Sequence, residues 1–163
     1  MKKSIIMFLV CLFVVSSVTY AEANSGATKS LSDKEKVALA ISNDAVAKQS
    51  VTAKELNKGV YTFVGNTGKQ QKKIKKLTLT PAPKGVVKDA PKDMRFYYAS
   101  PTKGTFGAVI GMSRSKVVVT AAQNAPNYKD VVKQGHVYDV QTLFAKYKNK
   151  GYKNTAKKIE IKK

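Results

Sequence analysis

The spacing of apolar residues after position 32 predicts two short helices. Ser32 and Glu35 match a capping box, in which the serine accepts from the first helical turn and the glutamate reaches back to the serine. The apolar residues that follow at helical spacing are Val37, Ala40 and Ile41. We therefore expect a helix over residues 33–47, and a shorter one that begins at the second capping box, 52–55, and ends at Gly59.

From residue 60 the pattern changes to short β-rich runs separated by turn residues. Residues 60–64 and 72–80 are predicted to pair as a hairpin, with the turn at 65–68. Pro81 ends the second strand, because proline has no N–H to donate to a ladder, and the chain up to Pro91 is predicted to be a loop.

Three further strands are predicted between residues 94 and 120. Large apolar side chains alternate with other residues over 94–99 and 106–112, as in half-buried strands, and a valine-rich run follows at 116–120. Because only short turns separate these runs, we expect an antiparallel meander.

The last part of the chain returns to helical spacing. Asp139 is placed to cap a helix with one apolar stripe. The stripe consists of Val140, Leu143, Phe144 and Tyr147. Gly151 is predicted to end this helix, and residues 152–163 fit either a short helix or a terminal strand. The whole pattern predicts one small α+β domain, with an antiparallel sheet of about five strands and helices near the N- and C-terminal ends.

The first residues have the pattern of a secretory signal peptide. Two lysines precede an uncharged apolar run that is shorter than the roughly 20 residues of a membrane span. Small residues favour cleavage after Ala23, with Ala21 as the second choice; an uncleaved membrane anchor is the alternative. We divide the chain into a signal peptide (1–23), a flexible lead (24–30) and a folded domain (31–163). The protein is expected to be secreted, and to be extracellular or associated with the cell wall.

Cysteine and charge narrow the chemistry of the secreted domain. Cys11, the only cysteine, lies in the apolar run and lacks the small preceding residue that lipidation requires, so the mature chain has no thiol. The formal net charge of +20 falls only to +19 when Lys2, Lys3 and Glu22 are removed with the signal peptide. The excess positive charge therefore belongs to the folded domain.

The type of basic residue argues against sequence-specific nucleic-acid binding. Arg95 and Arg114 are the only arginines. Arginine offers a flat bidentate fork to phosphates and guanine edges, whereas lysine is a mobile, well-hydrated point charge. We therefore expect diffuse attraction to polyanions and no specific nucleic-acid partner.

The C-terminal tail resembles a group of bacterial proteins. The run 138–147, Tyr-Asp-Val-Gln-Thr-Leu-Phe-Ala-Lys-Tyr, followed by Lys157, Lys158 and Ile159, resembles small secreted proteins and lipoproteins of unknown function from lactic-acid bacteria. In that family a cationic strand-rich domain ends in a helix with two adjacent tyrosines, whereas Lys148 stands here in place of the second. The lipid-modified cysteine of many members has no counterpart either. The resemblance implies a Gram-positive extracellular setting and no known activity.

Lysines gather in two stretches, which we predict to bind polyanions. The first contains Lys69, Lys72, Lys73, Lys75 and Lys76. The second contains Lys146, Lys148, Lys150, Lys153, Lys157, Lys158, Lys162 and Lys163. If these sets share a face, their field would collect polyanions, and outside a Gram-positive cell these are anionic cell-wall polymers (teichoic acids) or the anionic membrane surface. The alternative is that the lysines only keep the domain soluble.

Catalytic patterns are weak in this sequence. His136 is the only histidine, and a structural or surface role is expected for it. A triad can be written from Ser113, His136 and either Asp130 or Asp139, but Ser115 stands where a nucleophile elbow needs glycine.

Phosphate and metal patterns are also incomplete. Gly68 and Lys69 superficially match a phosphate loop, but Phe63 and Gln70 occupy positions that need glycine and a hydroxyl residue, so a turn is predicted. The carboxylates do not gather as a calcium loop requires, and no metal or cofactor is expected.

Three hypotheses for function follow. The first is a non-enzymatic protein held electrostatically to anionic cell-envelope polymers. The second is a binding or inhibitory module for a protein or peptide, using a sheet face around Arg95, Tyr97 and Val109. The third and least favoured is an enzyme acting on wall polymers. The sequence makes no prediction of the oligomeric state.

Overall fold

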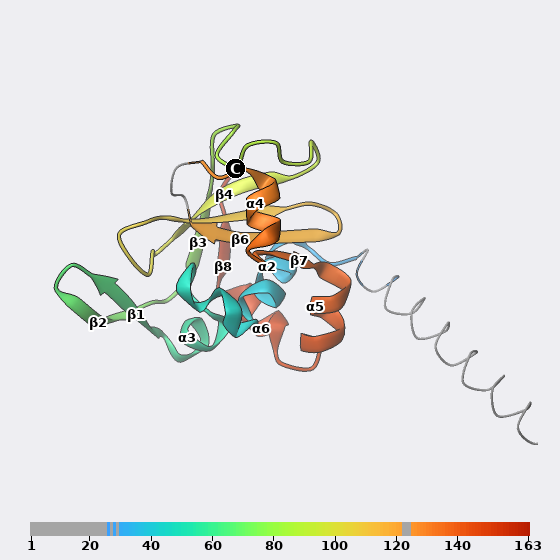
Figure 1. Cartoon of the computed structure of the whole chain (residues 1–163). Helices are drawn as coiled ribbons and strands as arrows, with labels where there is room; N and C mark the ends of the chain where they lie inside the picture. Colours follow the sequence, from blue (N-terminus) through green and yellow to red (C-terminus); the bar gives the residue numbers. More distant parts are fainter. Residues whose placement is uncertain (1–25, 27, 29, 122–124) are drawn as a thin grey trace, which may run out of the picture. The chain divides into compact units, whose positions relative to one another are not determined.

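The structure, a computed structural model, describes residues 26, 28, 30–121 and 125–163 (Figure 1). The chain divides into two units, Met1–Leu31 and Ser32–Lys163, and the second unit is the one described below. The predicted signal peptide, 1–23, lies outside the described residues, together with Cys11 and most of the predicted lead.

A six-stranded mixed sheet forms the centre of the domain (Figure 1). Its strands are β3 (Leu77–Pro81), β4 (Arg95–Ser100), β5 (Ala108–Met112), β6 (Lys116–Ala121), β7 (Val137–Asp139) and β8 (Ile159–Ile161). They lie in the order β7-β6-β5-β4-β3-β8, and every neighbouring pair is antiparallel except β3 and β8. The predicted α+β class and the meander β4-β5-β6 are confirmed, with six strands in this sheet rather than about five and with one parallel pair.

Helices lie near both ends of the domain, as predicted. They are α2 (Asp33–Ile41), the 3-10 helix η1 (Asp44–Lys48), α3 (Ala53–Lys58), α4 (Tyr128–Lys133), α5 (Val140–Tyr147) and α6 (Tyr152–Lys157). Both capping boxes form, and Gly59 ends α3 with a left-handed φ of 79°. The predicted helix over 33–47 is wrong in its length, since α2 ends at Ile41. The Asn43 side chain accepts from the backbone of Ala45 and starts η1, so a polar side chain competes with the helical ladder.

A separate two-stranded hairpin extends from the helical side of the domain (Figure 1). It consists of β1 (Val60–Gly65) and β2 (Gly68–Lys73), which pair along their whole length. The predicted partner strand over 72–80 is wrong, because β2 ends at Lys73 and β3 belongs to the large sheet. The reason is tertiary: Leu77 and Leu79 are fully buried there, between β4 and β8.

Both faces of the central strands are covered. On the face that carries Tyr97 and Ile110, α2 packs against β5, β6 and β8, and α5 and α6 pack in turn against α2. On the other face, Val109 packs in a buried cluster with Met94 of the preceding loop and Val131 of α4. As a result all of β5 is buried, although alternation had predicted a half-buried strand.

The C-terminal segment resolves the remaining predictions. Asp139 caps α5 by accepting from the Thr142 N–H at 2.9 Å, as predicted, and most of the apolar stripe is buried. Gly151 does not end α5, which stops at Tyr147; with φ of 72° it instead precedes α6. Residues 152–163 form both predicted alternatives, the helix α6 and the strand β8.

Candidate polyanion-binding surface

The β1-β2 hairpin presents the first lysine group to solvent. All six residues of β2 are exposed, and Val60–Lys73 contains no carboxylate. Lys69 and Lys73 share one hairpin face, and Lys72 projects from the other, where its ammonium lies 3.8 Å from the centre of the Phe63 ring. Lysines on such an open edge also discourage pairing with another strand. The hairpin is therefore a positively charged projection whose charge is not neutralised within it.

The first and second lysine groups meet at the edge of the large sheet. Lys75 and Lys76 form the exposed link between β2 and β3, and the Leu77 N–H donates to the Lys158 carbonyl at 2.9 Å. Lys76 forms an ion pair with Glu160 of β8. The hydrogen bond from Lys76 and its positive charge lower the pKa of the Glu160 carboxyl below its usual value. One of the five lysines in the first group is thus already paired.

Lys158 has a structural role that its sequence position did not reveal. Its ammonium donates to the carbonyls of Leu56 and Asn57, at 3.3 and 3.2 Å, at the end of α3. A cation at a helix C-terminus interacts favourably with the exposed carbonyls and the helix dipole. Lys158 therefore ties α3 to the start of β8, and we remove it from the polyanion-binding set.

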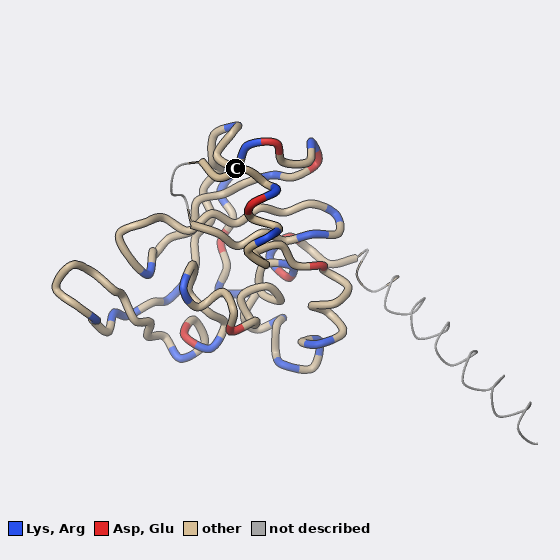
Figure 2. The backbone as a smooth tube through the Cα atoms, in the orientation of Figure 1, with Lys and Arg blue, Asp and Glu red and all other residues tan. Residues whose placement is uncertain are grey.

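The other members of the second group extend along the domain. Lys146 and Lys150 lie 5.2 and 5.4 Å from the centre of the Tyr147 ring, and the ammonium of the half-buried Lys148 lies 6.0 Å from that of Phe144. Lys153, Lys157, Lys162 and Lys163 are exposed. The group runs from the α5-α6 connection to the opposite end of β8, where the chain ends (Figures 1 and 2).

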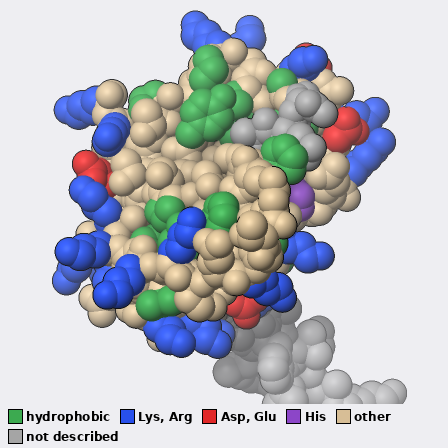
Figure 3. Space-filling model, turned by 90° about the vertical axis from the view of Figure 1, so that its left-hand side faces the viewer, with side chains coloured by type: hydrophobic (Ala, Val, Ile, Leu, Met, Phe, Trp, Pro, Cys, Tyr) green, Lys and Arg blue, Asp and Glu red, His purple; other side chains and the backbone are tan. Residues whose placement is uncertain are grey.

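The thirteen predicted lysines do not make one compact patch. Figure 2 shows Lys and Arg spread over most regions of the fold, and Figure 3 shows them around most of the outline, with few carboxylates between them. Ion pairs within the described residues engage four carboxylates, those of Asp33, Glu55, Asp139 and Glu160. The surface is therefore positive over most of its extent, with its densest run of lysines on the hairpin and the link that follows it.

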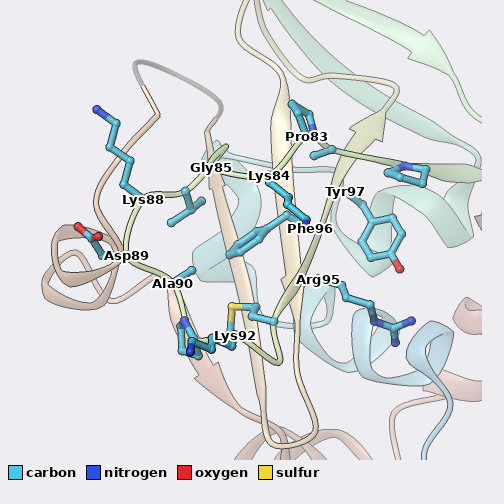
Figure 4. Close-up of a pocket in the computed structure, with 15 residues that line it drawn as sticks. Pro83, Lys84, Gly85, Lys88, Asp89, Ala90, Lys92, Arg95, Phe96 and Tyr97 are labelled. Atoms are coloured by element: carbon cyan, nitrogen blue, oxygen red, sulfur yellow. The ribbon is translucent and has the colours of Figure 1, made fainter.

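A third basic group, which the sequence analysis missed, surrounds a cavity at the start of β4 (Figure 4). The cavity has a volume of about 570 Å³ and lies between β4 and the loop that carries Lys84, Lys88 and Lys92. Figure 4 shows Lys84 beside Phe96, with Lys88 pointing outward. Arg95 points to the opposite side of the strand, where it pairs with Asp33 of α2 at 2.6 Å. The sequence offered one signal for this basic group, since Lys84, Lys88 and Lys92 recur at every fourth residue.

Glu55 connects the hairpin to the rest of the domain. Its carboxylate accepts from the Thr52 backbone and hydroxyl, from the Thr62 N–H of β1, and from the Lys103 ammonium at 2.8 Å. Burial alone would raise the pKa of Glu55, but these hydrogen bonds outweigh it and the pKa is lowered. Val64 of β1 also donates its N–H to the Lys103 carbonyl at 2.7 Å. Strand β1 is therefore held to α3 at Thr62 and to the β4-β5 connection at Val64, near the hairpin turn.

The structure does not assemble the triad considered above. The His136 ring contacts the Gln49 side chain through Nε2 at 3.1 Å, and its buried Nδ1 has no partner among the described residues. Burial lowers the pKa of His136. The Ser113 hydroxyl accepts from the Lys116 N–H, and Asp139 caps α5 and pairs with Lys116, while Asp130 is exposed on α4.

The three residues suggested as the face of a protein- or peptide-binding module do not form one exposed surface. Tyr97 and Val109 are buried on opposite faces of the sheet, and only Arg95 is exposed. The two residues point apart because alternate positions of paired strands face opposite sides. That assignment of residues is therefore wrong.

Two further observations concern the described part of the chain. Within it, no three His, Cys, Asp or Glu side chains gather as metal ligands would, and none of its helices is long and apolar enough to cross a membrane.

Gly65 and Gly68 form the hairpin turn, as predicted, and Gly68 has φ of 102°, which favours glycine.

Comparison with protein-family models, with curated proteins and with solved structures found no match to this chain. The resemblance to secreted proteins of lactic-acid bacteria therefore stays a hypothesis.

Proposed function

We propose that the protein is a secreted, non-enzymatic protein that associates electrostatically with anionic polymers of the cell envelope. Teichoic acids are the partner class, and anionic headgroups of the membrane surface would respond to the same field. The observation that carries the proposal is the β1-β2 hairpin, with three exposed lysines on β2 and no carboxylate. A projection of this kind brings uncompensated charge toward a long polyanion.

The spread of the remaining charge defines the mode of binding. Because basic side chains lie on most sides of the domain, a flexible polymer would contact several of them without a single shaped site. Lysine suits this mode, since it acts as a hydrated point charge with no preferred geometry. The free energy of binding then comes largely from released counterions, so salt is the decisive variable.

The test measures the affinity of the purified protein for purified teichoic acid between about 50 and 500 mM salt, across which screening should weaken such binding sharply. We expect log K to fall linearly with log salt concentration. The triple variant Lys69→Gln, Lys72→Gln, Lys73→Gln should bind more weakly and show a shallower slope, because fewer counterions are released.

The matched control replaces uncharged residues of the same exposed strand, Gln70→Ser and Gln71→Ser, and should leave both affinity and slope unchanged. Affinity that does not depend on salt, or a triple variant that binds like the control, would overturn the proposal.

A further inference from the structure

A second cavity lies between the hairpin and the body of the domain. Its volume is about 650 Å³, and it is lined by β1, by the end of η1 and by the connection from β4 to β5. Cavities of this size commonly hold small molecules. It is separate from the loop cavity at the start of β4, because the two share no lining residue.

Two apolar side chains that line this cavity are unusually exposed to solvent. Val64 and Phe106 both line it, and their exposed fractions are 50% and 54%. They are two of only four large hydrophobic residues that are exposed among the described residues. Exposed apolar groups that gather at one concave site mark a binding surface more often than isolated ones do. The hairpin side of the domain, turned to the viewer in Figure 3, shows apolar side chains beside lysines.

The walls of the cavity are held in place by a backbone bridge and by an ion pair. Val64 and Gly104 form a β-bridge, which brings β1 against the β4-β5 connection. The ion pair between Lys103 and Glu55 fixes the same connection to α3. The cavity therefore exists before any ligand enters, and little of the binding free energy is needed to order it.

The polar part of the lining is positive. Lys48, Lys69 and Lys103 line the cavity, and among the residues that the structure describes no Asp or Glu does. Lys103 is neutralised by Glu55, whereas Lys48 and Lys69 form no ion pair within the described residues. Two unpaired ammonium groups at the rim of an apolar hollow complement a negative head on an apolar chain.

We propose that this cavity binds a small anionic amphiphile, that is, a free molecule with an acidic head and a short apolar chain. Phe106 and Val64 contact the chain, and Lys48 and Lys69 hold the acidic head. The site is concave, so a free molecule enclosed by it buries both side chains, whereas a flat lipid bilayer does not follow its shape. This inference does not rest on the proposed binding to wall polymers, although Lys69 belongs to both surfaces.

The experiment is an NMR titration of the purified protein with octanoate, and with 1-octanol as the uncharged match. We expect saturable shifts centred on Val64, Gly104 and Phe106, and tighter binding of octanoate than of octanol. Phe106→Ser should weaken octanoate binding at least about tenfold, while Phe106→Leu, which keeps an apolar wall, should stay close to the wild type. At low salt, the double variant Lys48→Gln, Lys69→Gln should bind octanoate no more tightly than octanol. Each lysine replaced should weaken octanoate binding by about fivefold.

Matched controls lie on α4, outside the cavity. Val132 is 48% exposed there, and Val132→Ser together with Lys129→Gln should leave octanoate binding unchanged. Shifts centred elsewhere, no saturation, equal affinity for octanol and octanoate, or binding only to vesicles of an anionic phospholipid would overturn the proposal.

A further variant separates this proposal from the proposed function. Lys72→Gln with Lys73→Gln lies outside the cavity lining and should weaken binding to teichoic acid without changing octanoate affinity.

Discussion

Glu55 provides the sharpest test of how the hairpin is held. Its side chain is 20% exposed and that of Lys103 is 12% exposed, so the pair is largely removed from water. The same carboxylate also completes the capping box of α3 and accepts from the β1 backbone at Thr62. Replacing Glu55 should therefore affect the helix start and the attachment of the hairpin together.

Two substitutions separate these contributions. Glu55→Gln keeps an acceptor that suits a capping box but removes the charge that Lys103 pairs with, so we expect a loss of about 1–2 kcal/mol in the free energy of unfolding. Glu55→Ala also removes the acceptor for the Thr52 and Thr62 N–H groups, while Thr52 still caps the helix, and this adds about 1 kcal/mol. The assay is urea unfolding at neutral pH, followed by circular dichroism and analysed by linear extrapolation.

The pH dependence of the effect has a defined sign. The folded-state pKa of Glu55 lies below the usual 4.5, so the ionised form stabilises the fold. The difference in unfolding free energy between the wild type and Glu55→Gln should be fully present above pH 4.5 and should shrink as the pH falls through the folded-state pKa. Glu160→Gln, at an exposed pair, is the control and should change stability little.

The reasoning is refuted if Glu55→Gln is as stable as the wild type at neutral pH. It is equally refuted if the loss persists unchanged well below pH 4.5, because a charge-dependent contribution must disappear there.

Two further predictions concern the core and the C-terminal helix. Leu79→Ala should lower the free energy of unfolding by about 2–5 kcal/mol, because Leu79 is fully buried in the sheet between β4 and β8; a loss below about 1 kcal/mol in urea unfolding would contradict this packing. Asp139→Ala should cost about 1 kcal/mol through loss of the α5 cap, whereas Asp139→Asn, which retains a capping acceptor, should cost less; equal losses for the two variants in thermal unfolding would contradict the capping role.

Features of the fold that depend on local sequence were predictable. The two capping boxes, the Gly59 helix end and the Asp139 cap each involve partners within a few residues, and all form as expected. Local sequence did not predict that residues 72–80 divide between β2 of the hairpin and β3 of the large sheet. Strand β3 leaves the hairpin because Leu77 and Leu79 pair with β8, about eighty residues further along the chain.

The candidate site shows the same distinction. The predicted lysine group at 69–76 overlaps the exposed strand β2, because a run with no apolar residue has no means of being buried, although the strand itself was predicted over 72–80. The sequence could not show which lysines already bind other groups of the domain. Lys158 binds carbonyls of α3, and Lys103 binds Glu55, through contacts that only the tertiary fold creates. The wide spread of basic side chains in Figure 3 has the same origin, since sequence distance says little about which side of the domain a residue occupies.

The measurement that tests the central claim most directly is the fraction of protein bound to isolated cell walls before and after their teichoic acid is removed, in dilute buffer. An electrostatic association with these polymers predicts that most of the bound protein is lost from the stripped walls, and that added salt releases it from the intact ones. Equal binding to both preparations would contradict the account.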